Sequence, residues 1–195
     1  MKASDLFVKC LETEGVTKIF GIPGEENADL MISLKKSKIE FVLCRHEQAA
    51  AFMADVYGRL TGKAGVCLAT LGPGVTNLMT GLADANMDRA PVVAIIGQGS
   101  TERLHKESHQ IMDSISMVAP ISKWAQTILS AKNVTEVVRK AFKVAETEKP
   151  GVTVIELPED VAKEEVNENP IKPSLIRRPA ADNRAVNEAI DLIIS

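Results

Sequence analysis

Short, nearly continuous apolar runs recur along this chain and constrain its fold more than any other feature of the sequence. The segments 64–70 (AGVCLAT), 91–97 (PVVAIIG) and 152–158 (VTVIELP) are apolar at almost every position. A strand covered on one face alternates apolar and polar residues, whereas a strand covered on both faces is apolar throughout. We therefore predict a sheet buried between two layers of helices.

Segments of helical periodicity alternate with these strands. The other predicted strands are the shorter apolar segments 17–22, 39–44 and 121–128. The first helix has an apolar face between Ala3 and Leu11, with Ser4 as its N-cap and Gly15 at its end. Further helices are predicted over 26–37 and from near Glu47, Val75, Ser108 and Asn133. The alternation predicts an α/β fold with a doubly wound, mainly parallel sheet and helices on both faces.

The composition changes towards the end of the sequence. Prolines cluster among Glu, Lys and Asn residues, at Pro158, Pro170, Pro173 and Pro179. A cluster of this kind is typical of an extended linker. We predict a first domain over 1–160, a linker over 161–180 and, from the apolar helical stripe that follows, the start of a truncated second domain over 181–195. Docking of that last helix onto the first domain is the alternative.

Charge and cysteine usage exclude several classes of function. The formal net charge is −3, and no cluster of Lys and Arg is interleaved with aromatic residues, so we expect no nucleic-acid partner. Cys10, Cys44 and Cys67 are far apart in the sequence, which begins with no apolar signal segment. No apolar stretch approaches about 18 residues, so we expect a cytoplasmic protein that does not span a membrane. A small molecule is then the expected ligand.

Two local motifs suggest cofactor or metal sites that the sequence does not complete. GPGVTN, residues 72–77, follows a strand and opens a helix, but a dinucleotide fingerprint needs glycine at Asn77 and an acidic residue after the next strand, where the sequence is AIIGQG. The motif is therefore interpreted as a tight turn whose glycines let a ligand approach the backbone. His105 and His109 in HKESH have helical spacing, but Glu107 does not fit the zinc-protease patterns. We therefore predict no metal ligands in this chain.

Glu47 stands between the strand at 39–44 and a helix whose next residues are small or apolar. An acidic residue in the first turn of a helix is favourable in itself, by about 0.3 to 1 kcal/mol. A carboxyl at the carboxyl end of a strand, among apolar neighbours, can also be desolvated and hold a proton to share. Position alone leaves both interpretations open.

Three segments together carry a resemblance to a known family. They are GIPGEEN at 21–27, RHEQAAAFMADVYGRLTGKAGVCLATLGPGVTN at 45–77 and HQIMDSISMVAPISKWA at 109–125, in this order. The chain resembles the N-terminal, pyrimidine-binding domain of thiamine diphosphate-dependent enzymes over residues 2 to about 160. Within that family it is most similar to the large catalytic subunits of acetolactate synthases.

The resemblance implies a cofactor and roles for particular residues. Glu47 matches the glutamate that hydrogen-bonds N1′ of the cofactor's aminopyrimidine, and proton sharing there favours the tautomer whose 4′ nitrogen takes the C2 proton of the thiazolium. Gln110 matches a glutamine near the reacting centre. The residues that match the loop, strand end and turn around the pyrimidine are Pro23, Gly24, Thr70, Pro73, Gly74 and Asn77.

The resemblance also implies partners and an activity for the full-length protein. Acetolactate synthases are transferases that decarboxylate pyruvate and condense the product with a second 2-keto acid, in acetoin metabolism or branched-chain amino acid biosynthesis. The family's diphosphate and Mg²⁺ site is a GDG motif, and none occurs in these 195 residues. We therefore expect this chain alone to be inactive, and the implied active site between subunits requires a homodimer or homotetramer.

Several alternatives stay open. Glu47 argues against glyoxylate carboligases, which lack this glutamate, and Ser108 before His109 argues against carboxylyases with paired histidines. His109 with Gln110 and Met112 with Asp113 are more similar to the catabolic, FAD-free synthases, although FAD binding stays undetermined. Another thiamine diphosphate-dependent 2-keto acid decarboxylase, oxidase or transferase, or an isolated non-catalytic module, would fit the same sequence.

Overall fold

The predicted sheet is present in a computed structural model that describes residues 1–173 and 180–195. Six strands lie parallel in the order β2-β1-β3-β4-β6-β5. They are β1 (Lys18–Gly21), β2 (Glu40–Leu43), β3 (Gly65–Ala69), β4 (Val92–Gln98), β5 (Trp124–Thr127) and β6 (Val152–Pro158). Each falls on a predicted segment, and the α/β fold with a doubly wound parallel sheet is confirmed.

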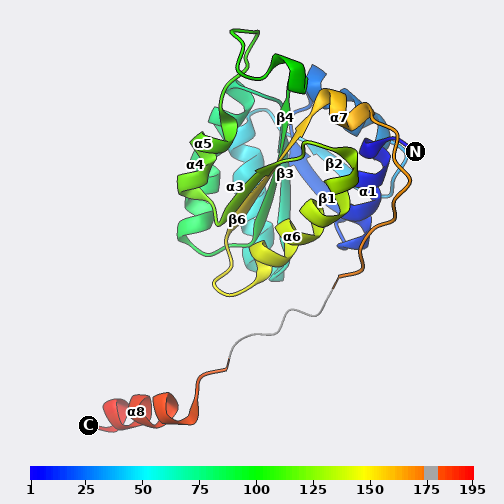
Figure 1. The fold of residues 1–195 in the computed structure, drawn as a ribbon. Helices are drawn as coiled ribbons and strands as arrows, with labels where there is room; N and C mark the ends of the chain where they lie inside the picture. Colours follow the sequence, from blue (N-terminus) through cyan, green and yellow to red (C-terminus); the bar gives the residue numbers. More distant parts are fainter. Residues whose placement is uncertain (174–179) are drawn as a thin grey trace.

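Helices cover both faces of this sheet (Figure 1). One face packs against α1 (Ala3–Thr13), α2 (Ala28–Leu34), α6 (Val134–Glu146) and α7 (Glu159–Lys163), and the other against α3 (Glu47–Thr61), α4 (Pro73–Met87) and α5 (Ser114–Val118). Alternate residues of one strand serve the two cores: Val66 and Leu68 of β3 face the first group of helices, and Cys67 and Ala69 face the second. Burial on both sides explains why the central strands are apolar at nearly every position.

The predicted N-cap of the first helix is wrong. Lys2 precedes α1, and Ser4 lies inside the helix, fully buried, where its hydroxyl accepts a hydrogen bond from Ser33 Oγ at 3.1 Å. The backbone N–H of Ala3 donates instead to the carbonyl of Glu164 at 2.8 Å. A distant backbone segment therefore supplies the acceptor that a capping side chain usually provides. Gly15 does follow the end of α1, with a φ of 83°.

The helix predicted from near Ser108 begins only at Ser114. Residues 99–113 form a long connection with one short 3₁₀ turn, η2 (Thr101–Arg103). His105 and Gln110 have φ values of 64° and 56°, which interrupt a right-handed helix. The backbone N–H of Thr101 donates to both carboxylate oxygens of Asp160, each at 3.0 Å, so contacts with α7 determine the path of this loop.

The predicted domain limits remain a prediction. The chain stays packed on the first domain through α7, and Val166, whose backbone N–H donates to the Met1 carbonyl, is buried. Residues 174–179 of the predicted linker, Pro179 included, lie outside the described residues. Helix α8 (Asn183–Ile194) has Asp182 as its N-cap and exposes all its residues. None of the helices in the described ranges has both the length and the apolar character needed to cross a bilayer.

Candidate functional site

The topology of the sheet predicts a crevice, called the Glu47 crevice below, at the carboxyl ends of β1 and β3. These strands are neighbours, but the chain leaves β1 towards α2 on one face and leaves β3 towards α4 on the other. In parallel α/β sheets such a divergence is where ligands bind. The loop 22–27 follows β1 and the turn 70–74 follows β3, so both lie at these carboxyl ends.

Glu47 contributes its carboxylate to the crevice from the first residue of α3. The N-cap of this helix is His46, whose Nδ1 accepts from the backbone N–H of Gln48 at 3.2 Å. The Glu47 side chain is buried, with 8% of its surface exposed. Asn77 Nδ2, on α4, donates to Glu47 Oε2 at 3.0 Å and so fixes the orientation of the carboxylate.

Space is left beside the other carboxylate oxygen because residue 74 is glycine. A Cβ at Gly74 would lie 3.7 Å from Glu47 Oε1 and 3.2 Å from the Thr70 methyl group. Gly24, on the loop after β1, packs so closely on Thr70 that a Cβ there would come within 2.5 Å of the threonine side chain. The structure therefore brings Glu47, Gly74, Thr70 and Gly24 together, as the resemblance implies.

The remaining predicted residues lie around the turn that opens α4. Pro73 is the first residue of α4 and is exposed, and Pro23 is exposed on the loop after β1. Gln110 lies on the long 99–113 loop. Its backbone contacts Gly72, where an added Cβ would lie 2.5 Å from the Gln110 carbonyl oxygen. Gln110 is thus next to the crevice although it is far from the turn in sequence.

Two residues of the GIPGEEN segment were not predicted as site residues. Glu26 Oε2 accepts a hydrogen bond from the Thr70 hydroxyl at 2.9 Å. Asn27 Oδ1 accepts from the Gly24 backbone N–H at 2.8 Å, while its Nδ2 is buried without a hydrogen-bond partner. The polar cluster EEN after a buried strand was the signal available in the sequence.

Comparison with known proteins identifies the family. Residues 1–117 match the family model described as thiamine pyrophosphate enzyme, N-terminal TPP binding domain. This match covers more than half of the chain. The chain belongs to the thiamine pyrophosphate enzyme family. Thiamine pyrophosphate and thiamine diphosphate are two names for the same cofactor.

Curated relatives in the family carry related names. An acetolactate synthase of Bacillus subtilis (strain 168) is 39% identical over 97% of this chain and 33% of its own length. A catabolic acetolactate synthase of Raoultella terrigena is 44% identical over 81% of this chain and 28% of its own length. A glyoxylate carboligase of Escherichia coli O157:H7 is 36% identical over 100% of this chain and 33% of its own length. The chain spans about a third of the length of these relatives.

The crevice of this thiamine pyrophosphate-binding domain fits the pyrimidine part of the cofactor. The carboxylate of Glu47 is held by Asn77 on one oxygen, and the other borders the space that Gly74 leaves open. A ring nitrogen that accepts or shares a proton is the natural partner of such a carboxyl. The histidines of HKESH lie in the 99–113 loop and not on a helix, so their spacing does not place them on one face. Within the described ranges, His, Cys, Asp and Glu form no cluster of three suited to a metal.

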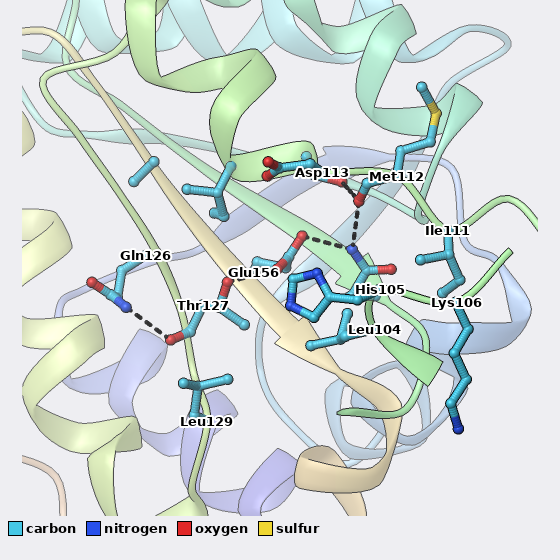
Figure 2. Close-up of a pocket in the computed structure, with 14 residues that line it drawn as sticks. Leu104, His105, Lys106, Ile111, Met112, Asp113, Gln126, Thr127, Leu129 and Glu156 are labelled. Atoms are coloured by element: carbon cyan, nitrogen blue, oxygen red, sulfur yellow. Dashed lines mark hydrogen bonds between the residues drawn. The ribbon is translucent and has the colours of Figure 1, made fainter. Parts of the chain in front are cut away.

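Another buried carboxyl, Glu156, lies on β6, the neighbour of the edge strand β5. Glu156 of β6 is 3% exposed and borders a cavity of about 480 Å³ beneath the 104–113 segment (Figure 2). Its Oε2 accepts from Thr127 Oγ1 at 2.6 Å, and its Oε1 accepts from Gln98 Nε2 at 3.0 Å. Burial raises the pKa of Glu156, and the hydrogen bonds from these donors oppose that rise. Neither Glu156 nor Gln98 was predicted, although an acid inside the apolar run VTVIELP was a visible signal.

The raised pKa of Glu156 predicts a pH dependence of stability. Because the folded state binds this proton more tightly than the unfolded state, the contribution is fully present below the usual value of 4.5 and is lost as pH rises through the folded pKa. The free energy of unfolding, measured by urea titration from about pH 4 to 8, should therefore fall with pH in the wild type relative to Glu156→Gln. The free energy of unfolding of the wild type minus that of Glu156→Gln should decrease as pH rises. A value that stays constant or increases with pH would contradict the raised pKa of Glu156.

Proposed function

We propose that this chain is the cofactor-activating N-terminal domain of an acetolactate synthase, whose full-length form decarboxylates pyruvate and condenses the product with a second 2-keto acid. The observation that carries the proposal is the buried Glu47 carboxylate, oriented by Asn77 and facing the space at Gly74. The names of the acetolactate synthase relatives support the choice within the family.

The residues of this chain would bind and orient the pyrimidine and control one proton. Glu47 would share a proton with the ring nitrogen N1′, and Asn77 would keep the carboxylate in the plane that this hydrogen bond needs. Thr70, held by Glu26, and Gly24 would form the wall beside the ring. When bound, the cofactor supplies the carbon nucleophile and accepts the electrons of the bond that breaks. Gln110, on the other side of the Gly72 turn, would contact the keto acid.

The diphosphate and its Mg²⁺ would be held outside this chain, because its 195 residues include no GDG motif. The three free, buried cysteines support a reducing, cytoplasmic environment.

The experiment that tests this proposal uses the full-length protein with thiamine diphosphate and Mg²⁺. With ¹³C-labelled pyruvate as the only substrate, we expect labelled carbon dioxide and acetolactate, both observed by NMR. Release of carbon dioxide with acetaldehyde as the only other product would indicate a decarboxylase. Turnover of glyoxylate in preference to pyruvate would indicate a carboligase.

We also propose that the domain associates with a second copy of the protein through α3. This helix carries Glu47 at its first residue and exposes apolar side chains further along, including Val56 and Leu60, of which Leu60 is 82% exposed. Phe52 and Met53 of the same helix line one shallow apolar hollow together with Val56 and Leu60. A contiguous apolar surface next to a functional residue is typical of a protein interface.

The double variant Val56→Asp, Leu60→Asp is expected to stay monomeric under conditions in which the wild-type chain associates. Two buried charges at such a surface should raise the dissociation constant by at least about thirtyfold, the effect of about 2 kcal/mol. Sedimentation velocity over a concentration series measures it. Met87→Asp is the matched control, because Met87 is 81% exposed at the end of α4. Equal association of both variants would argue against the α3 surface.

A further inference from the structure

The sheet has a second divergence point, which the adjacent strands β3 and β4 separate from the Glu47 crevice. Strands β4 and β6 are neighbours, but the chain leaves β4 towards α5 on one face and leaves β6 towards α7 on the other. The cavity that contains Glu156 opens at these carboxyl ends, together with that of β5. Its volume of about 480 Å³ lies in the range of small-molecule sites.

The groups around Glu156 are arranged for an ionised carboxylate. Thr127 Oγ1 and Gln98 Nε2 donate to its two oxygens, and Ser114 also hydrogen-bonds the side chain. Gln98 Nε2 also donates to the backbone carbonyl of Met112 at 3.1 Å, and Gln98 Oε1 accepts from the Gly99 N–H, which fixes the amide orientation. Donors on both oxygens favour the charged form of Glu156, and they partly oppose the burial that raises its pKa.

Glu156 has no positively charged side chain paired with it among the described residues. In the part of the chain that the structure describes, Glu156 makes no ion pair, and the nearby charge of Asp113 is also negative. Lys106 lines the cavity, but Figure 2 shows its side chain directed away from Glu156. His105, on the same segment, interacts with Asp113. A buried carboxyl without a counter-charge tends to hold a proton, so a cation bound beside Glu156 would favour its ionised form.

The walls of the cavity suit an apolar body. Leu104, Ile111, Ile115, Ala125 and Leu129 line it, and Leu129 is 62% exposed at its edge. The space is far larger than one bare metal ion needs, and among the described residues no three His, Cys, Asp or Glu side chains are grouped to hold one. A cation that fills this cavity would therefore have an apolar surface of its own.

We propose that this cavity binds a small organic cation, a primary amine with a short aliphatic body, whose ammonium group pairs with Glu156. The site involves none of the residues assigned to thiamine diphosphate, so the result of its test does not depend on the proposed function. It also lies against the loop that carries Gln110, because Gln98 links Glu156 to Met112.

Isoamylamine is a suitable probe, added to the ¹⁵N-labelled 195-residue chain. We expect saturable shifts of the Gln98 side-chain amide and of the backbone amides of Ile111 and Ser114. Isoamyl alcohol, which keeps the body and lacks the charge, should bind about tenfold to a hundredfold more weakly, the value of a hydrogen bond to a charged group. Ammonium chloride, which keeps the charge and lacks the body, should give no saturable shift. Equal binding of the alcohol, or the same shifts with ammonium chloride, would overturn the proposal.

Variants locate the probe. Glu156→Gln should weaken amine binding by the same factor, whereas Glu47→Gln, the same change at the buried carboxyl of the other crevice, should leave it unchanged. Leu129→Lys places a competing cation at the exposed edge of the cavity and should weaken binding about tenfold without risk to the core. In the wild type, affinity should rise with pH as Glu156 ionises, and Asp113→Asn should retain this dependence. Unchanged affinity in Leu129→Lys would overturn the proposal even if Glu156→Gln did not fold.

Discussion

Glu47→Gln in the full-length protein is expected to leave the fold intact and to slow C2 proton exchange of bound thiamine diphosphate by about 10²- to 10⁴-fold, the value of general acid–base catalysis. The amide keeps the shape of the carboxyl, and its oxygen can still accept the hydrogen bond from Asn77 Nδ2. It cannot share a proton with N1′ of the pyrimidine. Exchange into deuterated water, quenched with acid and followed by NMR, measures the rate directly.

The magnitude of this effect separates the two interpretations of Glu47 that the sequence leaves open. If the residue only stabilises the first turn of α3, the change should cost at most about 1 kcal/mol of unfolding free energy and leave exchange unaffected. Glu40→Gln is the control. Glu40 is the first residue of β2, whereas Glu47 follows the carboxyl end of that strand, and Glu40 pairs with Lys18 at the surface. An unchanged exchange rate with the cofactor fully bound would remove Glu47 from the mechanism and leave the proposed activity without its main support.

The strands could be predicted because burial on both faces leaves a local mark. Each residue of β3 is buried, and Val66 to Ala69 alternate between the two cores, so the sequence 65–69 contains no polar side chain. The edge strand β5 has partly exposed residues, and its predicted segment 121–128 extends beyond the observed Trp124–Thr127. Limits of strands thus become less certain where burial is incomplete.

Features decided by distant contacts could not be predicted in this way. The backbone N–H at the start of α1 donates to the carbonyl of Glu164, and the loop before α5 is attached through Thr101 to Asp160. Both partners are more than fifty residues away in the sequence. Local capping and periodicity, which placed Ser4 at a cap and a helix near Ser108, contain no information about such contacts.

The candidate site also contains features that could be predicted from the sequence and features that depend on distant contacts. Glu47 is singled out by its position after a predicted strand, whereas Asn77 is assigned to the site from the family resemblance. The pairing of Thr70 with Glu26, and the link from Glu156 through Gln98 to Met112, require the fold itself. The approach of Gln110 to Gly72 belongs to this second group, and it can be tested.

Gly72→Ala is expected to lower the free energy of unfolding more than an ordinary glycine substitution does. Gly72 has φ 54° and ψ −113°, a backbone conformation that costs an L-residue about 1 to 3 kcal/mol. The added methyl group would also lie 2.5 Å from the Gln110 carbonyl oxygen, and overlap of this kind costs about 1 to 3 kcal/mol more. Urea unfolding of the 195-residue chain measures the sum.

Gly62→Ala isolates the backbone contribution, because Gly62 has φ 68° but open space around its Cα. Its cost should be the conformational one alone, about 1 to 2 kcal/mol. The additional loss of unfolding free energy in Gly72→Ala then measures the contact with the Gln110 loop. Loss of this contact should also loosen the hydrogen bonds of the loop. The Ile111 N–H, which donates to the Ser108 carbonyl at 3.1 Å, should exchange with deuterium faster in Gly72→Ala and at the wild-type rate in Gly62→Ala. Equal costs with unchanged exchange at Ile111 would mean that Gln110 does not rest on the Gly72 turn in solution, and Gln110 would then lose its place beside the Glu47 crevice.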